Sequence, residues 1–199
     1  MPITALGKFR LFAAQHTGTT SVVTAFRKTC STIHECKYDG RHSWNVVLCD
    51  KCFKTPHAWI TLIRDPADWL CSAYRSVYLA PFEDWGWALS PFHIKMDKPK
   101  RWRKFDKILD VALSRPNFIG DIFQPYIEGA DYVTTIKLMT ELLLSLGFPG
   151  MADAIDRYRS KPRPEEIISD TQRALIYANE PRLMHYLEQV QKGLPCSSS

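Results

Sequence analysis

A single glycine followed by hydroxyl-bearing residues marks the stretch of the chain that is best suited to hold an anion. Apolar residues 11–14 lead into a short turn at Gly18, and a helical pattern over residues 19–29 follows the turn directly. Glycine lets the backbone approach an anion closely, and the N–H groups and positive dipole end of the helix point towards it. We therefore expect a phosphate cradle made of a strand, a turn and a helix. Its candidate contacts are the backbone at Gly18 and the hydroxyls of Thr17, Thr19, Thr20 and Ser21.

A second turn, which carries a positive charge, follows the most clearly apolar strand pattern, residues 58–63. Arg64 comes directly after that strand, and Asp65 and Pro66 have the residue types of a helix N-cap and first helical position. Ser72 lies about two turns into the expected helix, where its hydroxyl can join Arg64 on one phosphate. Ligands of open parallel sheets bind at the carboxyl ends of the strands. The two turns are therefore expected to grip the two anionic ends of one nucleotide.

The same residues count against a nucleoside-triphosphate hydrolase or kinase. A Walker A loop needs a lysine and a Ser or Thr directly after its last glycine. Here Thr19 and Thr20 follow Gly18, and no glycine lies five positions before it. The strand at 58–63 also delivers a cation, Arg64, where such enzymes usually place a magnesium-binding acid. We therefore do not expect triphosphate chemistry.

Alternating strand and helix patterns predict a single-domain α/β fold with a mainly parallel central sheet flanked by helices. Ser169 with Gln172 predicts a capping box, and Gly147 is expected to end the helix before it. The aromatic, proline-rich segment 79–101 is expected to be an ordered excursion, serving as a lid or an acceptor wall. The domain is expected over residues 1–192 and a disordered tail over 193–199. Strands are expected at 8–13, 32–38, 58–63 and 131–136, and helices at 19–29, 66–78, 102–114, 137–146, 150–158, 170–178 and 181–191.

The composition is that of an ordinary globular protein. The 199 residues are 45% hydrophobic and 24% charged, which suits one domain with a full core. A net charge of +5 favours an anionic ligand but is too small to demand nucleic acid. The sequence has no apolar run of membrane-spanning length and no secretory leader pattern, so we expect a cytoplasmic protein without membrane contact.

Four of the six cysteines fall within 23 positions and leave two interpretations open. Cys49 and Cys52 have the spacing of a zinc knuckle, and Cys30 or Cys36 with a histidine completes four ligands. The separation of Cys30 and Cys36 is irregular for such a site. In a reducing compartment, cysteines also serve as small buried apolar residues. We expect the second interpretation and therefore no metal.

The two turns together resemble the motifs of the sulfotransferases that use 3′-phosphoadenosine 5′-phosphosulfate (PAPS). Residues 15–20, Gln-His-Thr-Gly-Thr-Thr, align with the family loop Pro-Lys-Ser/Thr-Gly-Thr-Thr, which holds the 5′-phosphosulfate. The second family motif is an arginine, usually followed by Asp/Asn-Pro, with a serine eight residues after the arginine, and it binds the 3′-phosphate. Arg64, Asp65-Pro66 and Ser72 match it, and Tyr74 fits the aromatic residue that often follows.

The resemblance extends in outline to the later part of the chain. Residues 123–126, Phe-Gln-Pro-Tyr, with the strand at 131–136 and the helix ending at 146, resemble the later strand–helix unit of the family. Lys161 and Arg163 lie where many members close a basic loop over the nucleotide. The resemblance thus implies a P-loop-like sulfotransferase fold.

The activity that the resemblance implies is transfer of a sulfuryl group from PAPS to a hydroxyl or amine of an unidentified acceptor, with adenosine 3′,5′-bisphosphate (PAP) as the product and no metal. His16 occupies the position of the family lysine. A histidine is only partly charged near neutral pH, although a neighbouring anion favours its protonation. The alternative is therefore a catalytically silent module that binds PAP, PAPS or nucleic acid.

The family's general base is a histidine or a carboxylate, often after the second strand. Glu35 is the candidate favoured here, with His34, His42 and His57 as alternatives. The expected catalytic residues are thus His16 and Glu35.

Overall fold

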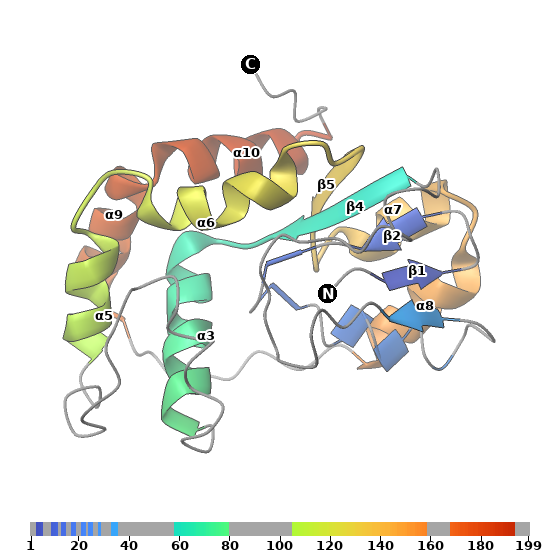
Figure 1. The fold of residues 1–199 in the computed structure, drawn as a ribbon, viewed down its shortest axis with the longest axis horizontal. Helices are drawn as coiled ribbons and strands as arrows, with labels where there is room; N and C mark the ends of the chain where they lie inside the picture. Colours follow the sequence, from blue (N-terminus) through green and yellow to red (C-terminus); the bar gives the residue numbers. More distant parts are fainter. Residues whose placement is uncertain are drawn as a thin grey trace.

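A five-stranded sheet forms the centre of the protein, which we describe from a computed structural model (Figure 1). The strands are β1 (Ile3–Ala5), β2 (Phe9–Leu11), β3 (Ile33–Glu35), β4 (Ala58–Ile63) and β5 (Tyr132–Thr135), in the spatial order β3-β1-β2-β4-β5. The structure describes residues 3–5, 9–11, 13–14, 17–18, 21–22, 24–25, 28, 33–35, 58–79, 105–158 and 168–193.

The sheet combines a parallel half with an antiparallel edge. β2, β4 and β5 are parallel neighbours, with Leu11 opposite Ile60 and Ile60 opposite Tyr132. β1 pairs antiparallel with both β2 and β3 and was not predicted. Only three residues separate β1 from β2, and so short a connection forces a hairpin, because a parallel crossover needs a dozen or more residues. The predicted α/β class is confirmed, while the sheet is mixed at its β1 edge.

Most of the predicted helices are present within a few residues of their expected bounds. The capping box of Ser169 and Gln172 is confirmed, and Gly147, with φ +82°, follows the C-cap residue of its helix as expected. The described residues between 21 and 28 are also helical. The helices are α3 (Pro66–Leu79), α5 (Phe105–Ala112), α6 (Phe118–Ile127), α7 (Met139–Ser145), α8 (Pro149–Tyr158), α9 (Asp170–Asn179) and α10 (Pro181–Gln191).

Helix α6 was missed by the sequence analysis, which placed no helix between residues 115 and 130. Its Pro125 lies within the helix and argued against helical structure there. The buried residues nevertheless recur at helical spacing, which was the available signal. They are Phe118, Ile119, Gly120, Phe123, Tyr126 and Ile127.

The N-terminal ends of α6 and α10 cap each other. Asn117, with φ +56°, accepts the backbone N–H of Arg182 at its Oδ1 atom (2.9 Å). Glu180 in turn accepts the backbone N–H groups of Ile119 and Gly120, each at 2.8 Å. Glu180 is 1% exposed, and burial raises the pKa of its carboxyl despite those two N–H groups. These side chains satisfy helix-end donors that have no partner within their own helices.

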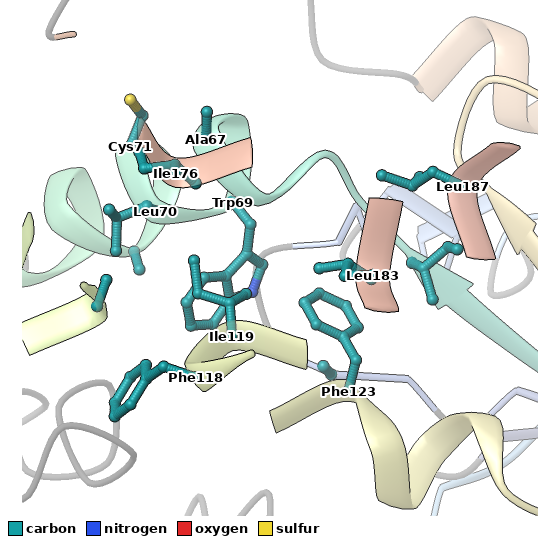
Figure 2. Close-up of a cluster of buried hydrophobic side chains, with 14 of the residues drawn as sticks. Ala67, Trp69, Leu70, Cys71, Phe118, Ile119, Phe123, Ile176, Leu183 and Leu187 are labelled. Carbon is teal, nitrogen blue, oxygen red and sulfur yellow. The ribbon is translucent and has the colours of Figure 1, made fainter. Parts of the chain in front are cut away.

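Two apolar cores lie on opposite faces of β4, as the two-residue period of a strand requires. Ile63 belongs to the core under α3, α5, α6, α9 and α10, where Trp69 and Phe123 meet edge to face with ring centroids 5.9 Å apart (Figure 2). Ile60 and Leu62 belong to the other core, with residues of β2, α7 and α8. Figure 1 shows α6 and α10 along one side of β4 and β5. Both faces of β4 are thus covered by helices.

Candidate functional site

The turn after β2 has the backbone that the sequence predicts between a strand and a helix. Gly18 has φ +97°, a conformation that L side chains rarely adopt. Its carbonyl accepts the backbone N–H groups of Ser21 (3.0 Å) and Val22 (3.3 Å), so it begins the helix that follows. Val22 and Ala25 are fully buried and fix that helix against the sheet. The predicted strand, turn and helix are thus present in the part of this stretch that the structure describes.

Thr17 helps to build this turn. Its hydroxyl donates to the carbonyl oxygen of Ala14 at 2.7 Å, and the residue is 0% exposed. It was expected to be one of the hydroxyl donors to an anion. In this structure the hydroxyl proton closes the turn through its bond to Ala14, so Thr17 shapes the backbone around Gly18.

Gly18 also lies against the end of β5. A Cβ atom placed on it would be 2.9 Å from Cγ1 of Ile136, the residue directly after that strand. Because β4 separates β2 from β5 in the sheet, the turn reaches past the end of β4. Arg64 directly follows β4 and is half-buried. The glycine turn and the arginine therefore lie at the same edge of the sheet.

The local role predicted for Asp65 and Pro66 is confirmed. Oδ1 of Asp65 accepts the backbone N–H of Asp68 at 2.9 Å, and its carbonyl accepts that of Trp69 at 2.8 Å. Pro66 is the first residue of α3. This N-cap fixes the direction in which the chain leaves Arg64 and enters the helix that carries Ser72.

A network between α3 and α9, which the sequence analysis did not predict, holds the start of α3. Nη1 of Arg173 lies 3.4 Å from Oδ1 of Asp65 and 3.1 Å from Oδ1 of Asp68. Tyr177 donates its hydroxyl to Oδ2 of Asp65 at 2.7 Å and accepts a hydrogen bond from Arg173 at 3.1 Å. The Tyr177 and Asp68 bonds raise the pKa of Arg173, and burial raises that of Tyr177. Partners more than 100 positions apart leave no local pattern, so no sequence signal could have found this network.

Ser72 and Tyr74 lie on different faces of α3. Ser72 is half-buried and lies one turn beyond Asp68, on the same side of the helix. Tyr74 packs edge to face against Phe105 of α5, with ring centroids 5.4 Å apart. The structure therefore gives Tyr74 a role in the core and leaves Ser72 accessible.

Glu35 is the last residue of β3, and β3 runs in the same direction as β2 because both are antiparallel to β1. It therefore lies at the same edge of the sheet as the Gly18 turn. In the register it is opposite Ile3, which is opposite Leu11. Two strand spacings, or about 10 Å, separate it from β2.

A shallow hollow of about 430 Å³ lies beside Asp65. Its other walls come from α10. Asp65 and Glu188 contribute carboxylates, so this hollow does not suit a phosphate. It is lined by Asp65, Pro181, Met184, His185, Leu187, Glu188 and Gln191.

Several sequence predictions fall outside the described residues. They concern the anion contacts Gln15, His16, Thr19, Thr20, Lys161 and Arg163, the alternative bases His42 and His57, the cysteines at 30, 36, 49 and 52, the segment 80–101 and the tail after residue 193.

Among the described residues, no three His, Cys, Asp or Glu side chains are grouped to hold a metal ion. Cys71 is buried in the first core. No helix in the described ranges is long and apolar enough to cross a membrane.

No protein-family model, curated protein or solved structure matches this chain.

Proposed function

We propose that this protein is a sulfotransferase of P-loop-like architecture that moves a sulfuryl group from PAPS to a hydroxyl or amine. One observation carries the proposal: a turn with Gly18 at φ +97° follows β2, and Arg64 follows the adjacent parallel strand β4. Both groups lie at the carboxyl edge of the sheet, where nucleotides bind in open α/β folds. Their residue types suit two separate anionic groups of one ligand.

The two turns divide the nucleotide between them in this proposal. The backbone around Gly18 and the helix after it receive the 5′-phosphosulfate. Arg64 and Ser72 bind the 3′-phosphate through charge-assisted hydrogen bonds. The N-cap at Asp65 and the network with Arg173 support this arrangement, because they fix the start of α3 between Arg64 and Ser72.

The proposed reaction is an in-line displacement at sulfur. The acceptor oxygen or nitrogen forms a bond to sulfur while the bond from sulfur to the 5′-phosphate oxygen breaks, and PAP leaves. The acceptor proton passes to the carboxylate of Glu35. Protonated His16 donates to the departing phosphate and stabilises its growing charge. Catalysis then rests on positioning and charge stabilisation, as it does in phosphoryl transfer.

Binding of PAP compared with AMP tests the proposal. Only PAP carries the 3′-phosphate, and its bonds to Arg64 and Ser72 are together worth on the order of a few kcal/mol. Calorimetry should show much tighter binding of PAP, and Arg64→Ala should remove most of the preference. Arg182→Ala is the matched control, because Arg182 pairs with Asp121 of α6 and not with a residue of either turn. Equal affinity of the wild-type protein for PAP and AMP would contradict the proposed sulfotransferase function.

His16 favours a second candidate, a silent module that binds the nucleotide without transferring its sulfuryl group. The two candidates differ in turnover and agree in PAP binding. Incubation with radiolabelled PAPS and a panel of hydroxyl and amine acceptors separates them. Tight PAP binding without labelled product, in both wild-type and His16→Lys protein, supports the silent module. Labelled product with any acceptor supports the enzyme.

A further inference from the structure

Two carboxylates lie at the N-terminal end of α3, next to the proposed 3′-phosphate position. Asp65 directly follows Arg64, and Asp68 precedes Ser72 by one helical turn. Side chains four residues apart on a helix are neighbours, with Cβ atoms ~5–6 Å apart. A phosphate held by Arg64 and Ser72 therefore lies close to two negative charges, and their repulsion opposes its binding.

Arg173 of α9 counters both of these charges. Its Nη1 atom contacts Oδ1 of Asp68 at 3.1 Å and lies 3.4 Å from Oδ1 of Asp65. Tyr177 lies one turn later on α9 and bonds both to Arg173 and to Asp65. The guanidinium is thereby held between the two carboxylates, on the side of α3 that also carries Ser72.

We propose that Arg173 is a specificity-determining residue for a phosphate monoester bound beside Arg64 and Ser72. This inference rests on the proposed function for the identity of the nucleotide, and it adds a residue that neither sequence motif contains. Two arginines and two aspartates make this group of side chains neutral before the ligand binds. Removal of Arg173 takes one positive charge from these four side chains, so the group becomes net negative.

The test measures the affinities of full-length variants for PAP and AMP by calorimetry. Arg173→Gln should weaken PAP binding roughly tenfold at low ionic strength, because one unit charge is lost about a helical turn from the phosphate. AMP binding should change far less. The PAP effect should shrink as salt is added, since the screening length falls from ~10 Å at 0.1 M to ~3 Å at 1 M. Arg173→Lys keeps the charge and should retain most of the preference for PAP.

Two further variants separate charge from structure. Asp68→Asn removes one of the repelling carboxylates and should strengthen PAP binding, and in the Arg173→Gln background it should restore much of the lost affinity. Asp65 is left unchanged because it caps α3. Arg182→Gln removes an equal charge from the pair with Asp121 and should leave the ratio of PAP to AMP affinity unchanged.

The outcomes distinguish this inference from the proposed function. A wild-type protein that prefers PAP, combined with an Arg173→Gln variant that keeps this preference, overturns the role of Arg173 alone. Equal weakening of PAP and AMP with a lower melting temperature shows that Arg173 only holds α9 on α3, and also overturns it. If the wild-type protein does not prefer PAP, the proposed function fails. Inorganic phosphate then tests the anion site: a thermal shift lost in Arg173→Gln supports the inference, and an unchanged or absent shift refutes it.

Discussion

Gly18 and Ile136 are in such close contact that a Cβ atom on the glycine would lie 2.9 Å from Cγ1 of the isoleucine. The contact joins the turn after β2 to the end of β5, although β4 lies between these strands. Gly18 therefore has two separate reasons to be glycine: its positive φ and the lack of space for a side chain. Both keep the backbone of the proposed phosphate cradle close to the sheet.

The first prediction is that Gly18→Ala destabilises the protein more than Gly147→Ala. Both glycines have positive φ, at +97° and +82°, so alanine costs about 1–2 kcal/mol at either position. Only Gly18 adds a steric clash, because nothing lies within 4 Å of a Cβ at Gly147. Overpacking adds about 1–3 kcal/mol. Urea unfolding of both variants measures the difference.

Ile136→Ala provides the control for this comparison. It removes Cγ1 and Cδ1 of Ile136 and leaves only Cβ, at 3.0 Å from a Cβ at Gly18, so the clash should be smaller in the double variant Gly18→Ala/Ile136→Ala. The two substitutions should then be non-additive, as expected for residues in contact. Strict additivity would show that the Gly18–Ile136 contact does not restrict position 18.

Much of the fold was predictable because its signals are local. The strand Ala58–Ile63 was predicted with its exact bounds from a continuous apolar run. The N-cap at Asp65 and the capping box at Ser169 follow from residue types a few positions apart. The same reasoning placed Gly18 in a turn before a helix, and the structure gives it positive φ.

The rest depends on partners far apart in the sequence. Glu180 caps a helix that begins about 60 positions earlier, and Arg173 reaches Asp65 over 108 positions. Nothing near Glu180 indicates that its carboxylate is buried on the N–H groups of Ile119 and Gly120. The antiparallel β1 was missed because three residues give too short a pattern to stand out.

A second prediction concerns Thr61, which is 1% exposed in the middle of β4. Its hydroxyl has no hydrogen-bond partner among the described residues. An unsatisfied buried hydroxyl is costly, so Thr61→Val should raise the free energy of unfolding by about 1 kcal/mol. Thr17→Val is the matched control: Thr17 is equally buried but donates to Ala14 at 2.7 Å, so its replacement should lower stability. Chemical denaturation that gives both variants the same sign would contradict this account.

A third prediction concerns Asn117, which combines φ +56° with acceptance of the Arg182 N–H. Asn117→Ala and Asn117→Gly both lose the acceptor, but only alanine strains the left-handed backbone, at about 1 kcal/mol. The alanine variant should therefore be the less stable of the two in thermal unfolding. Asn117→Asp keeps an acceptor oxygen and should remain close to wild type. An alanine variant as stable as the glycine variant would mean that the backbone relaxes at this position.

The last prediction is a pH dependence of stability that comes from Glu180. Burial raises the pKa of this carboxyl in the folded state above its ordinary value. At a pH between the pKa of the unfolded chain and the pKa of the folded protein, the folded protein binds more protons than the unfolded chain. The contribution of Glu180 is therefore fully present below its ordinary pKa and is lost as the pH rises through the raised value. The loss amounts to about 1.4 kcal/mol for each unit by which the pKa is raised.

Glu180→Gln isolates this contribution, because glutamine does not titrate. The free energy of unfolding of both proteins is measured in urea at a series of pH values from 4 to 8. We expect the stability of wild type relative to Glu180→Gln to be greatest at the acidic end and to fall as the pH rises. At the alkaline end the wild-type carboxylate still offers one acceptor oxygen to the N–H of Ile119 and one to that of Gly120. Glutamine has a single acceptor oxygen, so its NH₂ group would face one of these two N–H donors. A difference that instead grows with pH would show that the two N–H groups outweigh burial, and that the folded-state pKa of Glu180 is lowered.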